Sequence, residues 1–153
     1  MTKKLFIIAI VVLGATFAAH LYAYVDRLYF ETWWLDIPMH FFGGVGVGFL
    51  GLWYAMWRGF IAEGTGKVSI GGVTIDFNGR MPWWWTLEYP MLGIAIIAPA
   101  WEVAEMFMLA YFRRPIPQGL IGDTVLDIVL GTVGALVAWA VFHHVHYGYG
   151  RAQ

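Results

Sequence analysis

The chain has no cysteine among its 153 residues, and this absence narrows the chemistry that it can perform. Without thiols there is no disulfide framework, no thiolate metal site and no cysteine nucleophile. Any metal ion that the protein binds must therefore be held by carboxylate and imidazole side chains.

Charged residues are also scarce, at 12% of the sequence, whereas hydrophobic residues make up 60% and aromatic residues 18%. This composition is too apolar for an ordinary soluble domain, and it indicates a membrane protein surrounded by the lipid bilayer. The lysines and arginines are scattered and form no basic stripe, so nucleic acid is excluded as a partner.

Four apolar segments are long enough to cross a bilayer, and they cover residues 5–25, 33–57, 85–112 and 120–143. An open sheet would leave backbone groups unpaired in hydrocarbon, so all four segments are expected to be helices. Tryptophans gather near the segment ends, as in the aromatic belts of membrane proteins. We predict an all-α membrane protein in which residues 1–153 form a single domain of four transmembrane helices.

The first apolar segment follows Lys3 and Lys4 and shares some features with a cleavable signal peptide. Its length, about 21 residues, is enough to span the bilayer and favours a retained helix. The longest connection, residues 58–84, contains an alternating pattern around Gly71 and Gly72 that predicts a small β-hairpin between the second and third helices.

Basic residues divide unequally between the two sides of the predicted bundle. One side has Lys3, Lys4, Arg58, Lys67, Arg80 and Arg151, and the other has Arg27, Arg113 and Arg114. Because short cytoplasmic loops carry the excess of lysine and arginine, both termini and the hairpin are predicted to be cytoplasmic.

Ionisable residues interrupt the apolar segments in three pairs. The pairs are Asp36 with His40, Glu102 with Glu105, and Asp123 with Asp127. A spacing of three or four residues places both members of a pair on one helix face. At 1.5 Å per residue, every pair lies roughly 5 to 15 Å from the outer end of its helix. Because charge is costly in lipid, we expect these six side chains to line one cavity that opens outward.

Carboxylates and imidazoles in such a cavity are potential ligands for Zn²⁺, Mn²⁺ or Mg²⁺. Helix capping is the alternative for Asp36, which precedes Pro38, and for Asp123, which follows Gly122. A structural ion pair is the alternative for the two glutamates, which lie in the middle of an apolar run.

Histidines occur at two further places. His20 reaches the same depth as the three pairs, and we expect a hydrogen-bonded core or interface histidine there, with a role as a ligand as the alternative. His143, His144 and His146 lie at the cytoplasmic end of the last segment and are expected at the membrane interface, with metal binding there as the alternative.

The same residues carry a family likeness. Residues 35–44, 101–106 and 123–128 contain D-x-x-x-H, E-x-x-E and D-T-x-x-D blocks that resemble the YjdF family of bacterial inner-membrane proteins. More distantly, the layout resembles VanZ-like proteins, although Gly131 stands where those proteins tend to have asparagine. The resemblance spans residues 33–137 and implies a multi-pass protein of the bacterial inner membrane.

Three functions fit these observations. In the first, a metal-dependent hydrolase acts on a lipid-linked or envelope substrate, Glu105 is the general base, and Arg113 and Arg114 hold the head group. In the second, the protein is a non-catalytic accessory or binding subunit of a larger membrane complex. In the third, the carboxylates and His40 form part of an ion or proton pathway.

Overall fold

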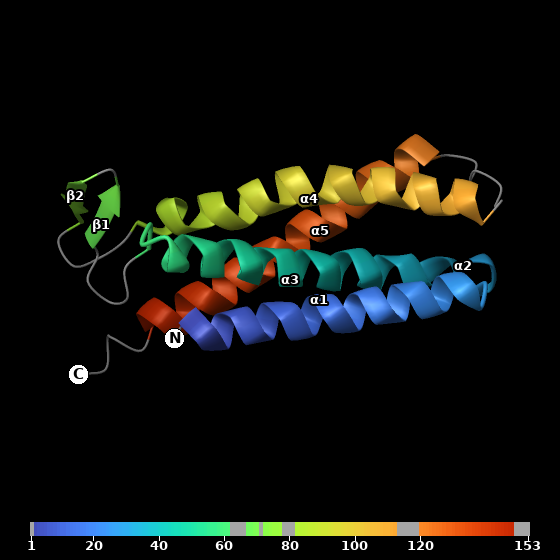
Figure 1. Ribbon diagram of the computed structural model, residues 1–153, viewed down its shortest axis with the longest axis horizontal. Helices are drawn as coiled ribbons and strands as arrows, with labels where there is room; N and C mark the ends of the chain where they lie inside the picture. The colour runs from blue at the N-terminus through green and yellow to red at the C-terminus, as the bar shows by residue number, and fades with distance from the viewer. Residues whose placement is uncertain (1, 62–66, 71, 78–81, 113–119, 149–153) are drawn as a thin grey trace.

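The computed structural model describes residues 2–61, 67–70, 72–77, 82–112 and 120–148 (Figure 1). Arg113 and Arg114, to which the sequence assigns a head-group role, lie outside the described residues, as does Gly71 of the predicted turn.

The described part of the chain contains four helices that are long and apolar enough to cross a membrane. They are α1 (Thr2–Val25), α3 (Asp36–Trp57), α4 (Trp83–Tyr111) and α5 (Leu120–His143). All four correspond to the predicted segments, with ends shifted by three residues or fewer. The predicted all-α membrane fold is therefore confirmed.

Short helical turns flank these helices. Two of them, α2 (Leu28–Glu31) and η1 (Trp33–Leu35), connect α1 to α3, and a π-helical turn, η2 (His144–Gly148), follows α5. The predicted second span, residues 33–57, included η1, whereas α2 precedes that span and no helix was predicted there. Arg27, just before α2, has a φ of 64°, a left-handed conformation that turns the chain out of α1.

The helix α3 lies at the centre of the bundle. Figure 1 shows α1 and α4 on either side of α3, while α5 runs diagonally behind, from the end of α4 towards the end of the bundle where α1 begins. The most extensive helix packing is between α3 and α5, followed by α1 with α3. The N-terminal halves of α3 and α5 are thereby placed close to each other and to the C-terminal half of α4.

Glycines allow the close packing of α3, as the sequence pattern suggests. A Cβ atom at Gly44 would collide with the backbone of Gly131 in α5, and one at Gly48 would come within 2.9 Å of Ala135. A Cβ atom at Gly51 would lie 2.6 Å from the carbonyl oxygen of Tyr89 in α4. These glycines are therefore contact points at which side chains are excluded.

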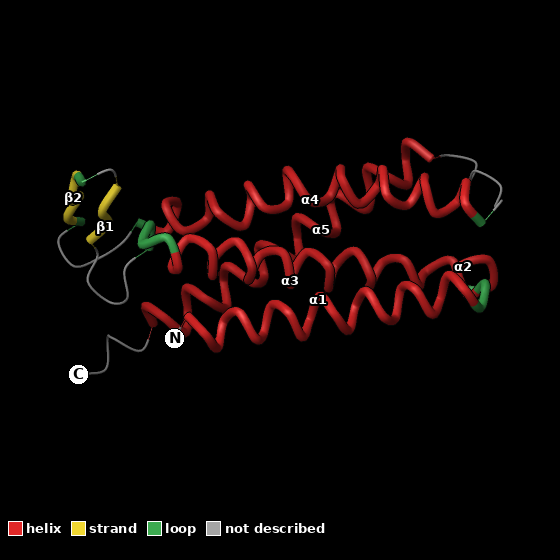
Figure 2. The backbone as a smooth tube through the Cα atoms, in the orientation of Figure 1, coloured by secondary structure: helices red, strands yellow, loops and turns green. Residues whose placement is uncertain are grey.

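The hairpin is also confirmed. Strand β1 (Lys67–Ile70) pairs with β2 (Val73–Asp76) in antiparallel register, with Lys67 opposite Asp76. The two strands lie at the end of the bundle where α1 begins (Figure 2). Val68 is 1% exposed and belongs to the same apolar cluster as Leu52 and Phe142, so the hairpin packs on the helix ends.

Adjacent glycines in α3 provide a test of this packing. Gly44→Ala should lower the free energy of unfolding by about 1–3 kcal/mol, because the methyl group forces α3 and α5 apart. Gly43→Ala should be neutral or stabilising by up to about 1 kcal/mol, since a Cβ atom there meets nothing within 4 Å and alanine favours helix. Denaturation in mixed micelles, followed by circular dichroism, measures both; equal stability of the two variants would contradict the assigned contact.

Candidate metal centre

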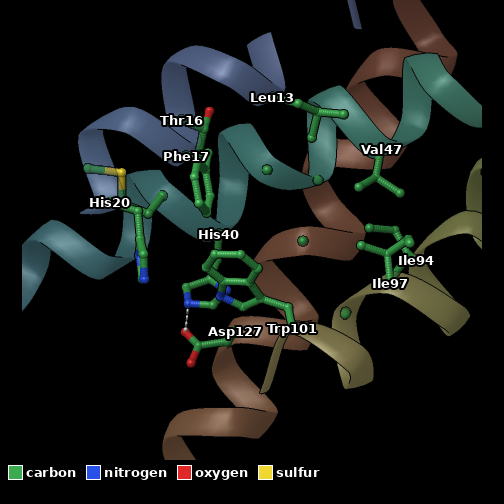
Figure 3. Close-up of a pocket in the computed structure, with 15 residues that line it drawn as sticks. Leu13, Thr16, Phe17, His20, His40, Val47, Ile94, Ile97, Trp101 and Asp127 are labelled. Atoms are coloured by element: carbon green, nitrogen blue, oxygen red, sulfur yellow. Dashed lines mark ion pairs between the residues drawn. The ribbon is translucent and has the colours of Figure 1, made fainter. Parts of the chain in front are cut away.

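His40, one turn into α3, is the central residue of the site. Its Nε2 atom lies 3.2 Å from Oδ1 of Asp36, on the same helix, and 3.5 Å from Oδ1 of Asp127 in α5. Asp127 is 4% exposed, so its carboxylate is buried inside the bundle. Figure 3 shows the contact between His40 and Asp127 as a dashed line.

The glutamates of α4 approach the same histidine. His40, Glu102 and Glu105 can each present one ligand atom within 4.8 Å of the others, and the same holds for Asp36, His40 and Asp127. The two groups share His40, and their residues come from the three helices α3, α4 and α5. Glu102 is fixed by the hydroxyl of Thr124 in α5, which donates a hydrogen bond to Oε2 at 2.9 Å.

Asp123 is set apart from these groups. It lies in the first turn of α5, its side chain is exposed, and it belongs to neither group of potential ligands. The structure thus brings together five of the six residues selected from the sequence. Neither aspartate is the N-cap that was considered as an alternative: Asp36 follows the N-cap residue Leu35, and α5 already begins at Leu120.

Two atoms at the centre of the site have unused bonding capacity. Nε2 of His40 and Oδ1 of Asp36 are buried, and neither makes a hydrogen bond to any residue in the described part of the chain. They face each other at ion-pair distance without hydrogen-bond alignment. Buried polar atoms normally find a partner, and a cation placed between ring nitrogen and carboxylate oxygens would supply one.

A cavity of about 250 Å³ adjoins the cluster. Its walls come from all four long helices. They comprise Leu13, Thr16, Phe17, His20, Met39, His40, Gly43, Gly44, Val47, Ile94, Ile97, Ala98, Trp101, Asp127 and Gly131. Most of these side chains are apolar, and the ionisable groups are His20, His40 and Asp127.

His20 is a hydrogen-bonded, buried histidine, as expected. The hydroxyl of Tyr29 in α2 lies 2.5 Å from its Nδ1 atom, and the ring of Trp101 packs edge-on at a centroid distance of 4.9 Å. Burial, followed by the charges of nearby carboxylates, raises the pKa of Tyr29 well above its usual range. One hydrogen bond therefore joins the protonated phenol to Nδ1 of His20.

The C-terminal histidines lie at the opposite end of the bundle. The ring of His146 stacks on Phe142 at a centroid distance of 5.1 Å, and His143 packs against Trp139. Neither belongs to a group of potential ligands among the described residues. These aromatic contacts place both rings among the side chains at the end of α5.

Three residues that shape the site were not selected from the sequence. Thr124 could have been found, because it lies between the two aspartates of its block. Trp101 directly precedes Glu102, but an aromatic residue in an apolar run carries no distinguishing signal. Tyr29 belongs to a turn between spans, and its contact with His20 depends on how that turn folds back.

Comparison with known proteins shows the family to which the sequence belongs. The sequence matches the family described as predicted membrane protein (DUF2238) over residues 2–148. The chain belongs to this family. No curated protein and no solved structure matches it. The comparisons thus support a membrane-protein family, and they lend no support to the more distant likeness to VanZ-like proteins.

Removal of the Tyr29 hydroxyl tests the buried histidine contact. Tyr29→Phe should lower the free energy of unfolding by about 1–3 kcal/mol, because Nδ1 of the buried His20 loses its hydrogen-bond partner. Tyr54→Phe is the matched control, since Tyr54 is 44% exposed on α3 and should tolerate the change. Thermal unfolding in detergent compares the two variants. Equal melting temperatures would show that the Tyr29 contact adds nothing to stability.

Proposed function

We propose that the protein binds a divalent cation, Zn²⁺, Mn²⁺ or Mg²⁺, through His40, Asp36, Asp127 and Glu102, and that it hydrolyses a lipid-linked substrate. The observation that carries this proposal is the pair of three-residue groups sharing His40, each with ligand atoms within 4.8 Å of one another. Carboxylates and an imidazole suit these ions, and cysteine is absent from the chain.

In this proposal the protein groups divide the work of hydrolysis. A divalent cation held by His40, Asp36, Asp127 and Glu102 would supply a polarised water molecule as the nucleophile near neutral pH. Glu105, the remaining member of the second group, is the general base that takes a proton from this water as its oxygen attacks phosphorus or carbon. The bond to the leaving oxygen breaks, and Glu105 returns the proton to that oxygen.

The distribution of polar side chains favours hydrolysis over transport. The half of the bundle nearest the hairpin is filled by an apolar cluster that includes Leu5, Leu52 and Phe142. Thr86 and Trp139, which lie in that half, are already hydrogen-bonded to each other at 3.0 Å. The described residues therefore provide no continuous row of polar groups from the site to the other side.

Membership in a YjdF-like family of the bacterial inner membrane is part of the same proposal, and so is an orientation with both termini in the cytoplasm. The start of α1 and the end of η2 lie at one end of the bundle, and the candidate site lies nearer the other end. With this orientation, the site faces the outer leaflet, where a lipid-linked envelope substrate would be found.

Metal analysis of purified protein tests the central part of the proposal. Wild-type protein should contain a divalent metal and gain thermal stability on its addition. Glu102→Gln and Asp127→Asn should each lower metal affinity by at least about tenfold, since changing even a residue that only hydrogen-bonds to a metal ligand typically costs about 10- to 100-fold. Affinity should also fall on acidification, since the ligands must lose their protons to bind.

Glu88→Gln is the control for these variants, because it makes the same chemical change on α4 at an exposed position. It should keep the metal content of the wild type. Metal retained by a combined Glu102→Gln, Glu105→Gln and Asp127→Asn variant would refute the site. A wild type without metal affinity would instead favour the accessory-subunit function.

Reporter fusions test the orientation. A reporter that is active only in the cytoplasm should work when fused after residue 153 and fail when inserted at position 118, between α4 and α5. The basic-residue excess on the terminal side is the reason for this expectation. The reverse pattern would place the candidate site in the cytoplasmic leaflet.

A further inference from the structure

Nε2 of His20 is a buried ring nitrogen that no described residue uses. In the tautomer in which the Tyr29 hydroxyl donates to Nδ1, the neutral ring carries its hydrogen on Nε2. This Nε2 is buried and has no hydrogen-bond partner in the described part of the chain, and the residue is 2% exposed. Because an unused buried polar atom is costly, the position calls for a hydrogen-bond partner beyond the described residues.

The two ends of the cavity beside His20 differ in polarity. Figure 3 shows His40 and Asp127 towards one end of the cavity and Val47, Ile94 and Ile97 towards the other. His40 and Val47 are seven residues apart on α3, which corresponds to about 10 Å along the helix. One end therefore offers charged and hydrogen-bonding groups, and the rest offers only hydrocarbon contact.

The cavity reaches the outer surface of the bundle between α1 and α4. Phe17 of α1 and Ile97 of α4 both line it, yet they are 51% and 44% exposed. In a membrane these side chains face lipid, so the cavity has a lateral opening to the bilayer. A hydrocarbon chain can enter there without crossing water.

Gly43 makes room inside the cavity. The other glycines of α3 described above are pressed against neighbouring helices, whereas a Cβ atom at Gly43 would meet nothing within 4 Å. The resulting volume, about 250 Å³, exceeds the roughly 150 Å³ of an engineered apolar cavity that binds benzene. It holds a segment of one hydrocarbon chain, not the whole of a lipid.

From these features we infer that the cavity binds the hydrocarbon chain of a phosphorylated lipid, with an oxygen of its head group accepting a hydrogen bond from Nε2 of His20. This inference rests on the proposed function and names its substrate class. The head then lies beside His40 and Asp127, where a cation would attract phosphate oxygens. Two sources share this chemistry: a phosphoglyceride and a polyprenyl phosphate.

Photocrosslinking tests the chain site directly. Purified wild-type protein is irradiated with phosphatidic acid that carries a diazirine in its acyl chain and, separately, with a diazirine-bearing polyprenyl phosphate. Mass spectrometry of the peptides should locate adducts on cavity residues such as Leu13, Val47 or Ile94 for at least one probe. The probe that labels identifies the source, and excess unlabelled lipid of the same kind should compete.

Two leucine substitutions separate the cavity from the lipid-facing surface. Gly43→Leu fills the cavity and should reduce cavity labelling about tenfold, as expected for loss of about 1.4 kcal/mol of binding free energy. Gly14→Leu is the matched control, because Gly14 is exposed on α1, is not a cavity residue and has nothing within 4 Å of its Cβ position. Undiminished labelling in Gly43→Leu, or an equal decrease in both variants, would overturn the inference.

A comparison of two further variants tests the role of His20. His20→Phe keeps an aromatic ring beside Trp101 but removes Nε2, whereas Tyr29→Phe breaks the same internal hydrogen bond and keeps Nε2. Labelling should fall about tenfold in His20→Phe and much less in Tyr29→Phe. Equal losses would mean that His20 acts only through packing, and the head-group contact would be refuted.

Metal content, measured on the same samples, distinguishes this inference from the proposed function. Gly43→Leu should keep its metal while losing the cavity label. Metal binding with no specific cavity label would overturn the chain site and leave the metal centre standing. A specific label that is blocked by Gly43→Leu in a protein with no metal affinity would refute the hydrolase and leave the chain site standing.

Discussion

The close contact between α3 and α5 determines the geometry of the polar site. Gly44 meets the backbone of Gly131, and a single methyl group at Gly44 would separate the two helices. One turn before Gly44, the same approach brings His40 of α3 to 3.5 Å from Asp127 of α5. In lipid, where association depends on packing and on satisfied polar groups, glycine contacts and the histidine contact support each other.

The bundle divides into two halves of different character. Near the hairpin, the centre is an apolar cluster to which α1, α3, α5 and β1 all contribute. Near α2, the centre contains His20, His40 and the carboxylates, together with a cavity. Charge in a bilayer is tolerated where partners or a ligand compensate it, so this second half is where function is expected.

The combination of a polar cluster and a laterally open apolar cavity suits an amphiphilic ligand. The cluster alone would fit a structural metal, and the cavity alone would fit any lipid tail. His40 and Asp127 belong both to the polar cluster and to the cavity wall, so the two features adjoin there. A phosphorylated lipid entering between α1 and α4 would place its head at the ionisable groups and its chain among the apolar ones.

The sequence by itself determined the four membrane-spanning helices, the hairpin and the polar pairs, because hydrophobic length, turn residues and helical spacing are local properties. Tertiary structure decided what these residues do together. In the folded chain Asp123 lies outside the two groups of potential ligands, and Tyr29 forms a hydrogen bond with His20. Gly43 faces a cavity, whereas its neighbour Gly44 packs against α5. Such choices depend on helix crossing and rotation, which arise from contacts between distant segments and are not encoded in any one of them.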